Sequence, residues 1–462
     1  MKILYIAAEI SPYASVGGLG EVGSSFPKAL KDTGKVEVRC VLPLYKGIKR
    51  KLKYLKDYPV SIHQGYETCI LKTDQEKRDI PVYFIQNDRF FYRDQIYGYE
   101  DDALRFYFLC KAVVETLKQI SFKPDIIHTN DWHTGILPLL LKKEFPNIKS
   151  VYTIHNITYQ GFLPAAYLSG ILTKEEEVQL DYPEWINFMK AGILHADLLT
   201  TVSPGYREEI LQPDWSCGMS ELLLHRKDKL LGILNGIDTK DYDPSDDGIL
   251  DYPYNISSID QKKKNRSLLR SNYGLADTEV PLIAMITRLD YSKGIELLIK
   301  AINSLDLDKF QLLILGTGST YYQGLLASIA ASYPNIALEC NYKPALAKKI
   351  YAAADIYLMP SLTEPCGLGQ LYAMRYGVVP IVNPVGGLKD TVTDEVDNPK
   401  KSSGFYMESW NAKALAKAIE RAISTYHTPD WSDYIRNCMA YDFSWSRSAT
   451  CYLECYKGLK YV

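Results

Sequence analysis

Residues 355–370 read DIYLMPSLTEPCGLGQ, a stretch that joins an apolar β-like run to the start of a helical pattern. Ligands of open α/β sheets bind outside the carboxyl ends of the strands, so a carboxylate and glycines at this junction indicate a binding site. The amides of Cys366, Gly367 and Leu368 would be donors at the helix start, and Glu364 would be a fixed acceptor. Binding the hydroxyl groups of a sugar requires such a mixture of hydrogen-bond donors and acceptors. A plain helix start with a surface glutamate has the same local sequence, so the rest of the chain has to separate the two interpretations.

Short apolar runs alternate with longer helical patterns through most of the chain, which predicts parallel sheets covered by helices. In the first half we expect strands at Lys2–Ala8, Val36–Leu42, Val82–Ile85, Asp125–His128, Ser150–Ile154, Leu198–Val202 and Leu230–Leu234. In the second half we expect them at Pro281–Thr287, Gln311–Leu315, Ile336–Glu339, Ile356–Met359 and Val379–Val382. Expected helices include Gly20–Lys31, Asp102–Gln119 and Thr134–Lys143.

A chain of 462 residues is too long for one compact core. The stretch between the two sets of strands is rich in Asp, Tyr, Pro, Ser and Asn and has little periodicity, which is typical of a linker. The sequence therefore predicts two doubly wound Rossmann-like α/β domains facing across a cleft, with the active site between them. The expected boundaries are residues 1–240, a linker at 241–260, residues 261–444, and a C-terminal helix at 445–462.

Composition argues against several classes of protein. A net charge of −2 gives no field that would attract nucleic acid or an anionic membrane surface. The N-terminal apolar run ends at Glu9, too soon for a signal peptide, and no later run reaches the roughly 20 apolar residues of a membrane span. Nine cysteines without a C-x-x-C pair indicate reduced thiols and a cytoplasmic protein.

Residues 18–23 match the G-x-G-x-x-G fingerprint of dinucleotide-binding enzymes. In that fingerprint the first glycine follows the strand almost directly, but here residues 10–16 intervene. The acidic residue expected about twenty positions further on is not clearly at a strand end either, because Glu37 precedes Arg39 within the strand. A loop with glycines that allow close backbone approach is the better interpretation.

Four further polar segments follow predicted strands, at residues 128–133, 155–161, 235–238 and 287–294. In the last of them, Arg288 and Lys293 lie on a strand-end loop and a helix start, an arrangement that suits a diphosphate without any metal. Two solvated surface cations are the alternative. The turn at residues 316–319 could add backbone donors, and no P-loop motif is present.

His128, Asp131 and His133 have the chemistry of zinc ligands. However, the chain has no H-E-x-x-H motif, and a strand-end run does not present ligands on one face as a helix does. A structural or sugar-binding role is the favoured interpretation. His155 would ordinarily be a hydrogen-bonded core histidine, but the polar residues around it after a buried strand favour a role in the site.

Taken together, these segments resemble the bacterial glycogen synthase and plant starch synthase family, glycosyltransferase family 5. The resemblance extends from Met1 to about Tyr456. It rests on the motifs G-G-L-G-E-V, N-D-W-H, H-N-x-x-Y-Q-G, V-S-P, I-L-N-G-I-D, R-L-x-x-x-K-G, E-P-C-G-L-x-Q, G-G-L-x-D-T-V and D-F-S-W. It implies a GT-B architecture whose last helix returns to the first domain. It also implies retaining transfer of glucose, usually from ADP-glucose, to the 4-hydroxyl end of an α-1,4-glucan, with no metal or other cofactor.

The resemblance also implies roles for individual residues. Four are catalytic: Arg288 and Lys293 neutralise the diphosphate, Glu364 holds sugar hydroxyls and faces the anomeric carbon, and His155 lies against the sugar, its backbone stabilising the oxocarbenium. The donor-binding set is Ser15, Gly17, Gly18, Asn235, Gly316, Gly318, Tyr342, Cys366, Gly367 and Leu368, with Tyr342 stacking on the adenine. The acceptor-binding set is Glu21, Tyr97, Asp131, Trp132, Tyr159 and Gln160.

The chain departs from the family's pattern at three positions of the donor pocket. Ser15 stands where a lysine normally reaches the donor phosphates, Val385 where a threonine often precedes Gly-Gly, and Ser319 where an acidic residue often follows Gly-Thr-Gly. Losing a cation from a buried diphosphate site costs about 1.5–3 kcal/mol. Two alternatives therefore stay open: a related glucosyltransferase that uses UDP-glucose or another nucleotide-glucose, and a weakened glucan-binding subunit that serves a partner synthase.

Overall fold

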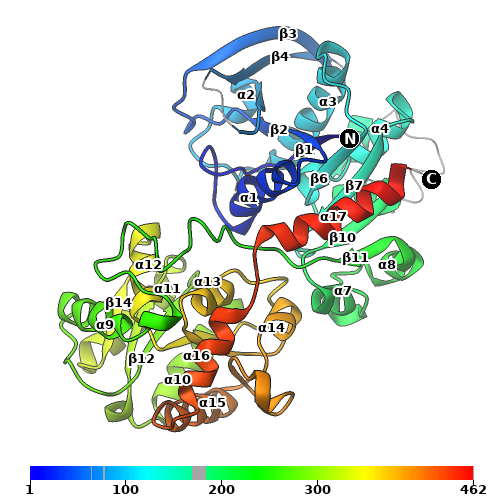
Figure 1. The fold of residues 1–462 in the computed structure, drawn as a ribbon. Coiled ribbons are helices and arrows are strands. Elements are labelled where there is room, and N and C mark those ends of the chain that lie inside the picture. Colours follow the sequence, from blue (N-terminus) through cyan, green and yellow to red (C-terminus); the bar gives the residue numbers. More distant parts are fainter. Residues whose placement is uncertain (64, 76–78, 169–183, 461–462) are drawn as a thin grey trace. The chain divides into compact units, whose positions relative to one another are not determined.

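The computed structural model describes residues 1–63, 65–75, 79–168 and 184–460, and the chain divides into two compact units. Unit 1 comprises Met1–Gly236 and Trp445–Val462, and unit 2 comprises Ile237–Ser444. Each unit is built on a mainly parallel sheet covered by helices (Figure 1), as the alternating pattern of the sequence predicts. Among the described residues, no helix is both long enough and apolar enough to span a membrane.

Unit 1 contains a nine-stranded sheet with the order β11-β10-β7-β6-β1-β2-β5-β4-β3. Its strands are β1 Lys2–Ile6, β2 Glu37–Pro43, β3 Leu52–Ile62, β4 Gly65–Asp74, β5 Val82–Gln86, β6 Ile126–Asn130, β7 Lys149–Ile154, β10 Leu198–Thr201 and β11 Leu230–Gly232. All neighbours pair in parallel except β3 with β4 and β4 with β5. A separate antiparallel pair consists of β8 Phe162–Pro164 and β9 Trp185–Asn187.

Along the chain, most helices of unit 1 connect one strand to the next. They are α1 Gly18–Asp32, α2 Asp88–Phe91, α3 Asp102–Gln119, α4 Leu137–Glu144, α6 Phe188–His195, α7 Pro204–Ile210, α8 Ser220–His225 and α17 Trp445–Lys460, with short 3-10 turns η1 Trp132–Thr134, η2 Ala165–Leu168, η3 Pro213–Trp215 and η4 Lys227–Lys229. The helix that the sequence predicts over Thr134–Lys143 is thus divided, because η1 ends at Thr134 and α4 begins only at Leu137.

The hairpin of β3 and β4 is absent from the sequence prediction. In β3 only Tyr58 and Val60 are buried, since this strand forms the edge of the sheet and most of its residues face solvent. Lysines and a proline are typical of edge strands, where they discourage pairing with another chain, but they also weaken the apolar signal by which a strand is recognised.

The C-terminal helix α17 packs on unit 1, next to α1. Its Trp445 and Tyr452 contact Phe26 of α1, with ring centroids 5.5 and 4.5 Å apart. The Tyr456 hydroxyl lies 2.6 Å from His128 Nδ1, and His128 Nε2 lies 2.6 Å from the Thr153 hydroxyl. Burial lowers the pKa of His128 to about 3, so its ring is neutral. His128 is therefore a hydrogen-bonded core residue that anchors α17.

Unit 2 contains a six-stranded, fully parallel sheet with the order β14-β13-β12-β15-β16-β17. Its strands are β12 Leu282–Ile286, β13 Gln311–Leu315, β14 Ile336–Glu339, β15 Ile356–Met359, β16 Val379–Val382 and β17 Phe405–Tyr406. The helices are α9 Gln261–Asn272, α10 Ile295–Ile302, α11 Thr320–Ser332, α12 Pro344–Ala353, α13 Gly369–Arg375, α14 Gly386–Thr391, α15 Ala412–Tyr426 and α16 Trp431–Ala440, with η5 Ile256–Ser258, η6 Tyr291–Lys293, η7 Leu307–Lys309 and η8 Pro399–Lys401.

Residues 241–260, which the sequence analysis interprets as a linker, are a packed part of unit 2. Leu250 and Tyr254 belong to its hydrophobic core, and the ring of Tyr242 stacks on Tyr372 of α13 at 3.8 Å between centroids. The segment looks like a linker in sequence because it lacks periodicity. Its tyrosines nevertheless bury enough apolar area to fix it, and the unit begins at Ile237.

Candidate active site

In unit 2 an ion pair lies where β15 and β12 end. Lys293 Nζ is 2.6 Å from Glu364 Oε2, and the Ser361 hydroxyl donates to the same oxygen at 3.0 Å. The two charged side chains are only 14% and 11% exposed. Because β13 lies on one side of β12 and β15 on the other, the pair lies at a topological switch point of the sheet, where α/β proteins bind ligands.

Backbone contacts fix Lys293 beside this loop. Gly294, which follows the lysine, has φ 73°, and a Cβ there would lie 2.4 Å from the Pro360 carbonyl oxygen. Only glycine allows this approach without strain. The Leu362 amide donates to the Ser292 carbonyl at 2.7 Å. The loops after β12 and β15 are thus joined on both sides of the Lys293–Glu364 pair.

The loop that carries Glu364 is anchored again at its far end. The Gly387 amide donates to the Glu364 carbonyl at 3.0 Å, and Gln370 Nε2 donates to the carbonyls of Cys366 and Gly367 at 3.0 and 3.1 Å. These hydrogen bonds tie the carbonyl groups of the loop leading into α13 to α13 and α14. Cys366, Gly367 and Leu368 therefore lie, as the sequence analysis expects, between a strand end and a helix start.

The remaining predicted residues of unit 2 follow neighbouring strands. The Leu289 amide donates to the Thr317 carbonyl at 2.8 Å, which holds the loop of Arg288 against the turn of Gly316 and Gly318. The Arg288 side chain is 62% exposed, and its nearest ion-pair partner, Asp290, is 3.7 Å away. Tyr342, half exposed, follows β14 and precedes α12. This edge of the sheet thus presents an exposed cation, an aromatic ring and a paired lysine.

In unit 1 Asp131 organises the corresponding edge, at the end of β6. It has φ 54°, and its Oδ1 accepts hydrogen bonds from the amides of His155 and Asn156 at 2.7 and 3.2 Å. Burial raises the pKa of Asp131 to about 7, although the two amide hydrogen bonds oppose the shift. The carboxyl group therefore joins the loops after β6 and β7 and titrates near neutral pH.

The ring of His155 is neutral. Burial lowers its pKa to about 3, and its Nε2 lies 2.9 Å from Asn130 Oδ1. Asn130 Nδ2 donates to the Ile6 carbonyl at 2.9 Å, so Oδ1 is the acceptor and His155 Nε2 carries the proton. His155 is therefore a fixed hydrogen-bonding group, and Nδ1 is left as the acceptor.

Glu9 is a buried carboxylate at the same edge of unit 1, and it is not among the site residues predicted from the sequence. It accepts a hydrogen bond from the Tyr97 hydroxyl at 2.8 Å and another from the Gly17 amide at 3.1 Å. It thereby ties the glycine loop before α1 to the Tyr97 ring, which stacks on His133 at 4.9 Å. Its only signal in the sequence is an acidic residue soon after an apolar strand, which by itself matches no motif.

Trp132, Gln160 and Tyr159 surround a tight turn. Gly161 has φ 69°, and a Cβ there would lie 2.1 Å from the Trp132 ring, so the tryptophan packs directly on the glycine backbone. Gln160 Nε2 donates to the Cys217 carbonyl at 2.8 Å, and Asn187 Nδ2 donates to Gln160 Oε1 at 2.6 Å. Tyr159 is 57% exposed. The turn is rigid, and it presents one aromatic ring to solvent.

The other predicted residues of unit 1 lie around the start of α1 and after β11. Ser15, Gly17 and Gly18 are exposed, and Glu21, in the first turn of α1, lies 3.5 Å from the Ser11 hydroxyl. Asn235 is buried, and its backbone N–H donates to the Val202 carbonyl at 3.3 Å. Within the residues that the structure describes, no group of three or more His, Cys, Asp or Glu side chains could hold a metal ion.

Comparison with known proteins identifies the family. Residues 2–225 match the starch synthase catalytic domain, and residues 270–437 match the glycosyl transferases group 1 domain. The chain is 41% identical to a glycogen synthase of Moorella thermoacetica over 99% of this chain and 96% of that protein. It is 37% identical to a glycogen synthase of Geobacillus stearothermophilus over 99% of this chain and 98% of that one. The chain belongs to the glycogen and starch synthase family.

Solved structures agree with this assignment. The catalytic domain of starch synthase IV from Arabidopsis thaliana, bound to ADP and acarbose, has a TM-score of 0.92 and 33% identity, covering 100% of this chain and 99% of that one. A sucrose-phosphate synthase from Thermosynechococcus elongatus has a TM-score of 0.64 at 19% identity and shows the shared fold alone. The predicted GT-B fold and the glucosyltransferase class are thereby confirmed. The glycines of residues 18–23 belong to a glycosyltransferase, and the dinucleotide interpretation is wrong.

Proposed function

We propose that the chain transfers glucose from ADP-glucose to the 4-hydroxyl at the non-reducing end of an α-1,4-glucan, with retention of configuration. The observation that carries this proposal is the Lys293–Glu364 ion pair at the switch point of unit 2, beside the exposed cation of Arg288. A diphosphate needs cations, a sugar needs a fixed acceptor, and this edge supplies both. The ADP and acarbose bound to the starch synthase IV relative support the choice of donor and acceptor.

In the proposed reaction, Arg288 and Lys293 stabilise the charge that develops on the leaving diphosphate. The bond from the anomeric carbon to the phosphate oxygen breaks, and that oxygen takes the electron pair. The acceptor's 4-hydroxyl oxygen then bonds to the anomeric carbon on the same face, and its proton passes to the leaving phosphate. In this proposal Glu364 holds sugar hydroxyls and faces the positive charge without bonding to the anomeric carbon.

The residues of unit 1 bind rather than react in this proposal. His155 is neutral, so it offers a hydrogen bond to a sugar hydroxyl but no proton to the leaving group. Asn235 is proposed to lie beside the donor sugar, together with His155. Tyr97, Asp131, Trp132, Tyr159 and Gln160, together with Glu21 at the start of α1, are proposed to bind the glucan acceptor. The proposed location is the cytoplasm, since all nine cysteines are free thiols, as a reducing compartment requires.

The test is glucose transfer to maltooligosaccharide, measured in parallel with ADP-, UDP- and GDP-glucose, for the wild-type chain and for Glu364→Gln. We expect preference for ADP-glucose and a loss of about 10²- to 10³-fold in kcat for the variant, with maltooligosaccharide affinity retained. Preference for UDP-glucose would move the proposal to another donor. Transfer by Glu364→Gln at the wild-type rate would contradict the assigned role of Glu364, and a trapped glucosyl-enzyme ester would contradict the same-face mechanism.

A further inference from the structure

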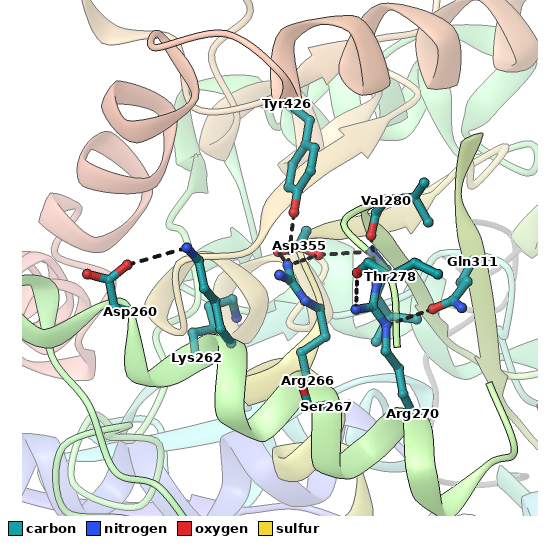
Figure 2. A network of polar contacts seen from close by, with 12 residues as sticks. Asp260, Lys262, Arg266, Ser267, Arg270, Thr278, Val280, Gln311, Asp355 and Tyr426 are labelled. Carbon is teal, nitrogen blue, oxygen red and sulfur yellow. Dashed lines mark hydrogen bonds and ion pairs between the residues drawn. The ribbon is translucent and has the colours of Figure 1, made fainter. Parts of the chain in front are cut away.

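Helix α9 of unit 2 buries three cationic side chains, Lys262, Arg266 and Arg270, which are 5%, 6% and 1% exposed. Figure 2 shows them along the helix, with Arg266 directed at Asp355 and Tyr426. In the sequence this region reads as a polar, lysine-rich run at the start of a helix, which favours a solvated face. Burying a cation without a partner costs free energy, so each of these side chains must be paired. The partners show which elements each cation holds in place.

Lys262 is held mainly by main-chain oxygens. Its Nζ donates to the carbonyls of Tyr351, Ala352 and Tyr376 at 2.9, 3.2 and 3.2 Å, and it lies 3.4 Å from the Tyr254 hydroxyl. Tyr351 and Ala352 are in the last turn of α12, and Tyr376 is the residue that caps the end of α13. The ammonium group thus joins the C-terminal ends of two helices, where the helix dipole favours a cation, and the Tyr254 hydroxyl supports it by donating to the Tyr376 carbonyl at 2.8 Å.

The opposite ends of these two helices lie at the candidate donor site. Helix α12 begins at Pro344, just after Tyr342, and α13 begins at Gly369, directly after Cys366–Leu368. The ten residues of α12 span about 15 Å. Any displacement of the end held by Lys262 is therefore carried along a rigid helix to a loop that is proposed to contact the nucleotide or the sugar.

Arg266 fixes the element between the two helices. Its Nη1 lies 2.6 and 2.7 Å from the two carboxylate oxygens of Asp355, and the Leu282 amide donates to Asp355 Oδ2 at 2.9 Å. Asp355 precedes β15, the strand that leads to the Glu364 loop. Successive turns of α9 therefore hold α12, β15 and α13 at the edge of the sheet opposite the candidate site.

We propose that Lys262 is a positioning residue of the donor site: its ammonium group fixes the C-terminal ends of α12 and α13, and thereby the loops of Tyr342 and Cys366–Leu368 at their N-terminal ends. The inference rests on the proposed function in that these loops bind the nucleotide-sugar. It adds a residue remote from the reacting atoms that controls donor affinity without touching the donor.

The same geometry makes donor affinity depend on pH. Burial lowers the pKa of Lys262 to about 7; Asp355 and Cys438 oppose the shift, whereas Arg266 adds to it. The Tyr254 hydroxyl is the other titratable group in contact. A neutral amine has one N–H group fewer than the ammonium ion, and it lacks the charge that strengthens each bond to the carbonyls of Tyr351 and Ala352; the Tyr376 carbonyl also accepts from the Tyr254 hydroxyl at 2.8 Å. Donor affinity should therefore fall as the pH rises through about 7.

Stability should change in the opposite direction, which separates positioning from a purely structural role. The pKa of Lys262 is lower in the folded chain than the ordinary lysine value of 10.5. Between those two pKa values the unfolded chain binds more protons, so the free energy of unfolding rises with pH. If Lys262 only contributed to stability, ADP binding would not weaken over the pH range in which the free energy of unfolding rises.

The experiment is calorimetric titration of the full chain with ADP from pH 6 to pH 9, for wild type, Lys262→Met, Lys262→Arg and Arg270→Met. Arg270 is the matched control, because it is equally buried on α9 but holds Gln311 at 2.7 Å and the Val280 carbonyl at 2.7 Å instead of α12 and α13. We expect Lys262→Met to raise the Kd for ADP about 10-fold at pH 6, with Arg270→Met near the wild-type Kd despite a lower Tm.

Lys262→Arg provides a second test should Lys262→Met fail to fold. An arginine stays protonated throughout this pH range, so the rise of the wild-type Kd above pH 7 should disappear. A Lys262→Met chain that binds ADP as wild type does, or a Lys262→Arg chain with an unchanged pH profile, would overturn the inference. A wild-type chain that transfers glucose but binds ADP independently of pH would overturn it while leaving the proposed function intact. A wild-type chain that binds no ADP would overturn both.

Discussion

The carboxyl edges of the two sheets carry opposite kinds of chemistry. In unit 1 the edge is organised by buried groups in fixed hydrogen bonds. Asp131 accepts hydrogen bonds from two backbone amides, and His155 is neutral because burial lowers its pKa to about 3. In unit 2 the edge carries the Lys293–Glu364 pair and the exposed Arg288. Both edges are formed by the ends of parallel strands in sheets covered by helices, so the fold does not dictate this difference.

The difference indicates what each edge is suited to bind. Buried groups held in fixed hydrogen bonds suit an uncharged glucan, which must be oriented but not stabilised as an ion. Cations that can exchange partners suit a diphosphate, whose charge grows as the sugar leaves. We therefore expect unit 2 to supply electrostatic stabilisation and unit 1 to supply orientation. Each prediction below tests one half of that division.

The largest effect is expected for Lys293→Met in unit 2. The variant removes a cation from the proposed diphosphate site and leaves the largely buried carboxylate of Glu364 without its ion-pair partner. We expect kcat/KM for the donor to fall about 10²- to 10³-fold. Lys300→Met, on the exposed face of α10, is the control in steady-state assays. A loss confined to the KM of maltooligosaccharide would break the comparison.

A smaller effect is expected for Asp131 in unit 1, where one oxygen accepts both amide hydrogen bonds. Asp131→Ala leaves the amides of His155 and Asn156 without their acceptor, and we expect a loss of about 10²-fold in kcat/KM. Asp131→Asn keeps an acceptor oxygen and tolerates the positive φ, so the loss should be nearer 10-fold.

The pKa of Asp131, about 7, sharpens this prediction. Below that pH the wild-type carboxyl group is protonated and resembles the amide of Asp131→Asn. The two chains should therefore differ more in activity at pH 8 than at pH 6. An equal ratio at both values would show that the charge of Asp131 has no part in its role.

Acid should destabilise unit 1 before unit 2. Burial lowers the pKa of His128, His133 and His155 to about 3, so these histidines stay neutral in the folded chain while the unfolded chain takes up protons below about pH 6.5. Their contribution is present above that pH and is lost as the pH falls, at about 1.4 kcal/mol per histidine and pH unit. Asp131 acts in the opposite direction, because its raised pKa makes the folded chain take up a proton first. Its protonation offsets the loss caused by about one of the three histidines.

Unit 2 contains one histidine, His427, which is exposed. Hydrogen exchange read by mass spectrometry from pH 7 to pH 4.5 would therefore show peptides of unit 1 losing protection first, once intrinsic rates are corrected. His128→Asn should move that onset to lower pH if the variant folds. Loss of protection in unit 2 first would contradict the assignment of buried, neutral groups to unit 1.

The smallest effect is expected for Ser15→Lys, which would give unit 1 the cation that the family's pattern leads us to expect at this position. Ser15 is exposed, so the new charge is largely screened, and we expect the donor KM to fall by at most about 10-fold. Val16→Lys, at an exposed neighbouring position, is the control. A change in the preferred nucleotide would show that unit 1 also contributes to donor choice.

Much of the fold was predictable from the sequence because apolar strands buried on both faces leave a continuous signal. The strands on both sides of β1 and β12 were predicted with ends within a few residues of those observed. The hairpin of β3 and β4 was missed because an edge strand exposes most of its side chains. The segment at 241–260 was misjudged because scattered tyrosines bury area without periodicity.

The predicted site residues follow the same division. Segments such as residues 287–294 and 360–370 were identifiable because strand ends, glycines and charged residues recur there in order. Glu9 was missed because a single carboxylate after a strand has no motif of its own, and its role depends on a contact with Tyr97, 88 positions further along the chain. The assignment of individual residues to donor and acceptor stays a prediction that the variants above test.

The sequence by itself determined the family, the parallel α/β class and the residue types at the strand ends, because these depend on local pattern and order along the chain. Only the tertiary structure decided which charges are buried and what they contact. Lys262 and Lys263 are adjacent in sequence, yet the first holds two helix ends and the second is exposed. The burial and pairing of Lys262 depend on residues up to 114 positions away, and no local pattern encodes that separation.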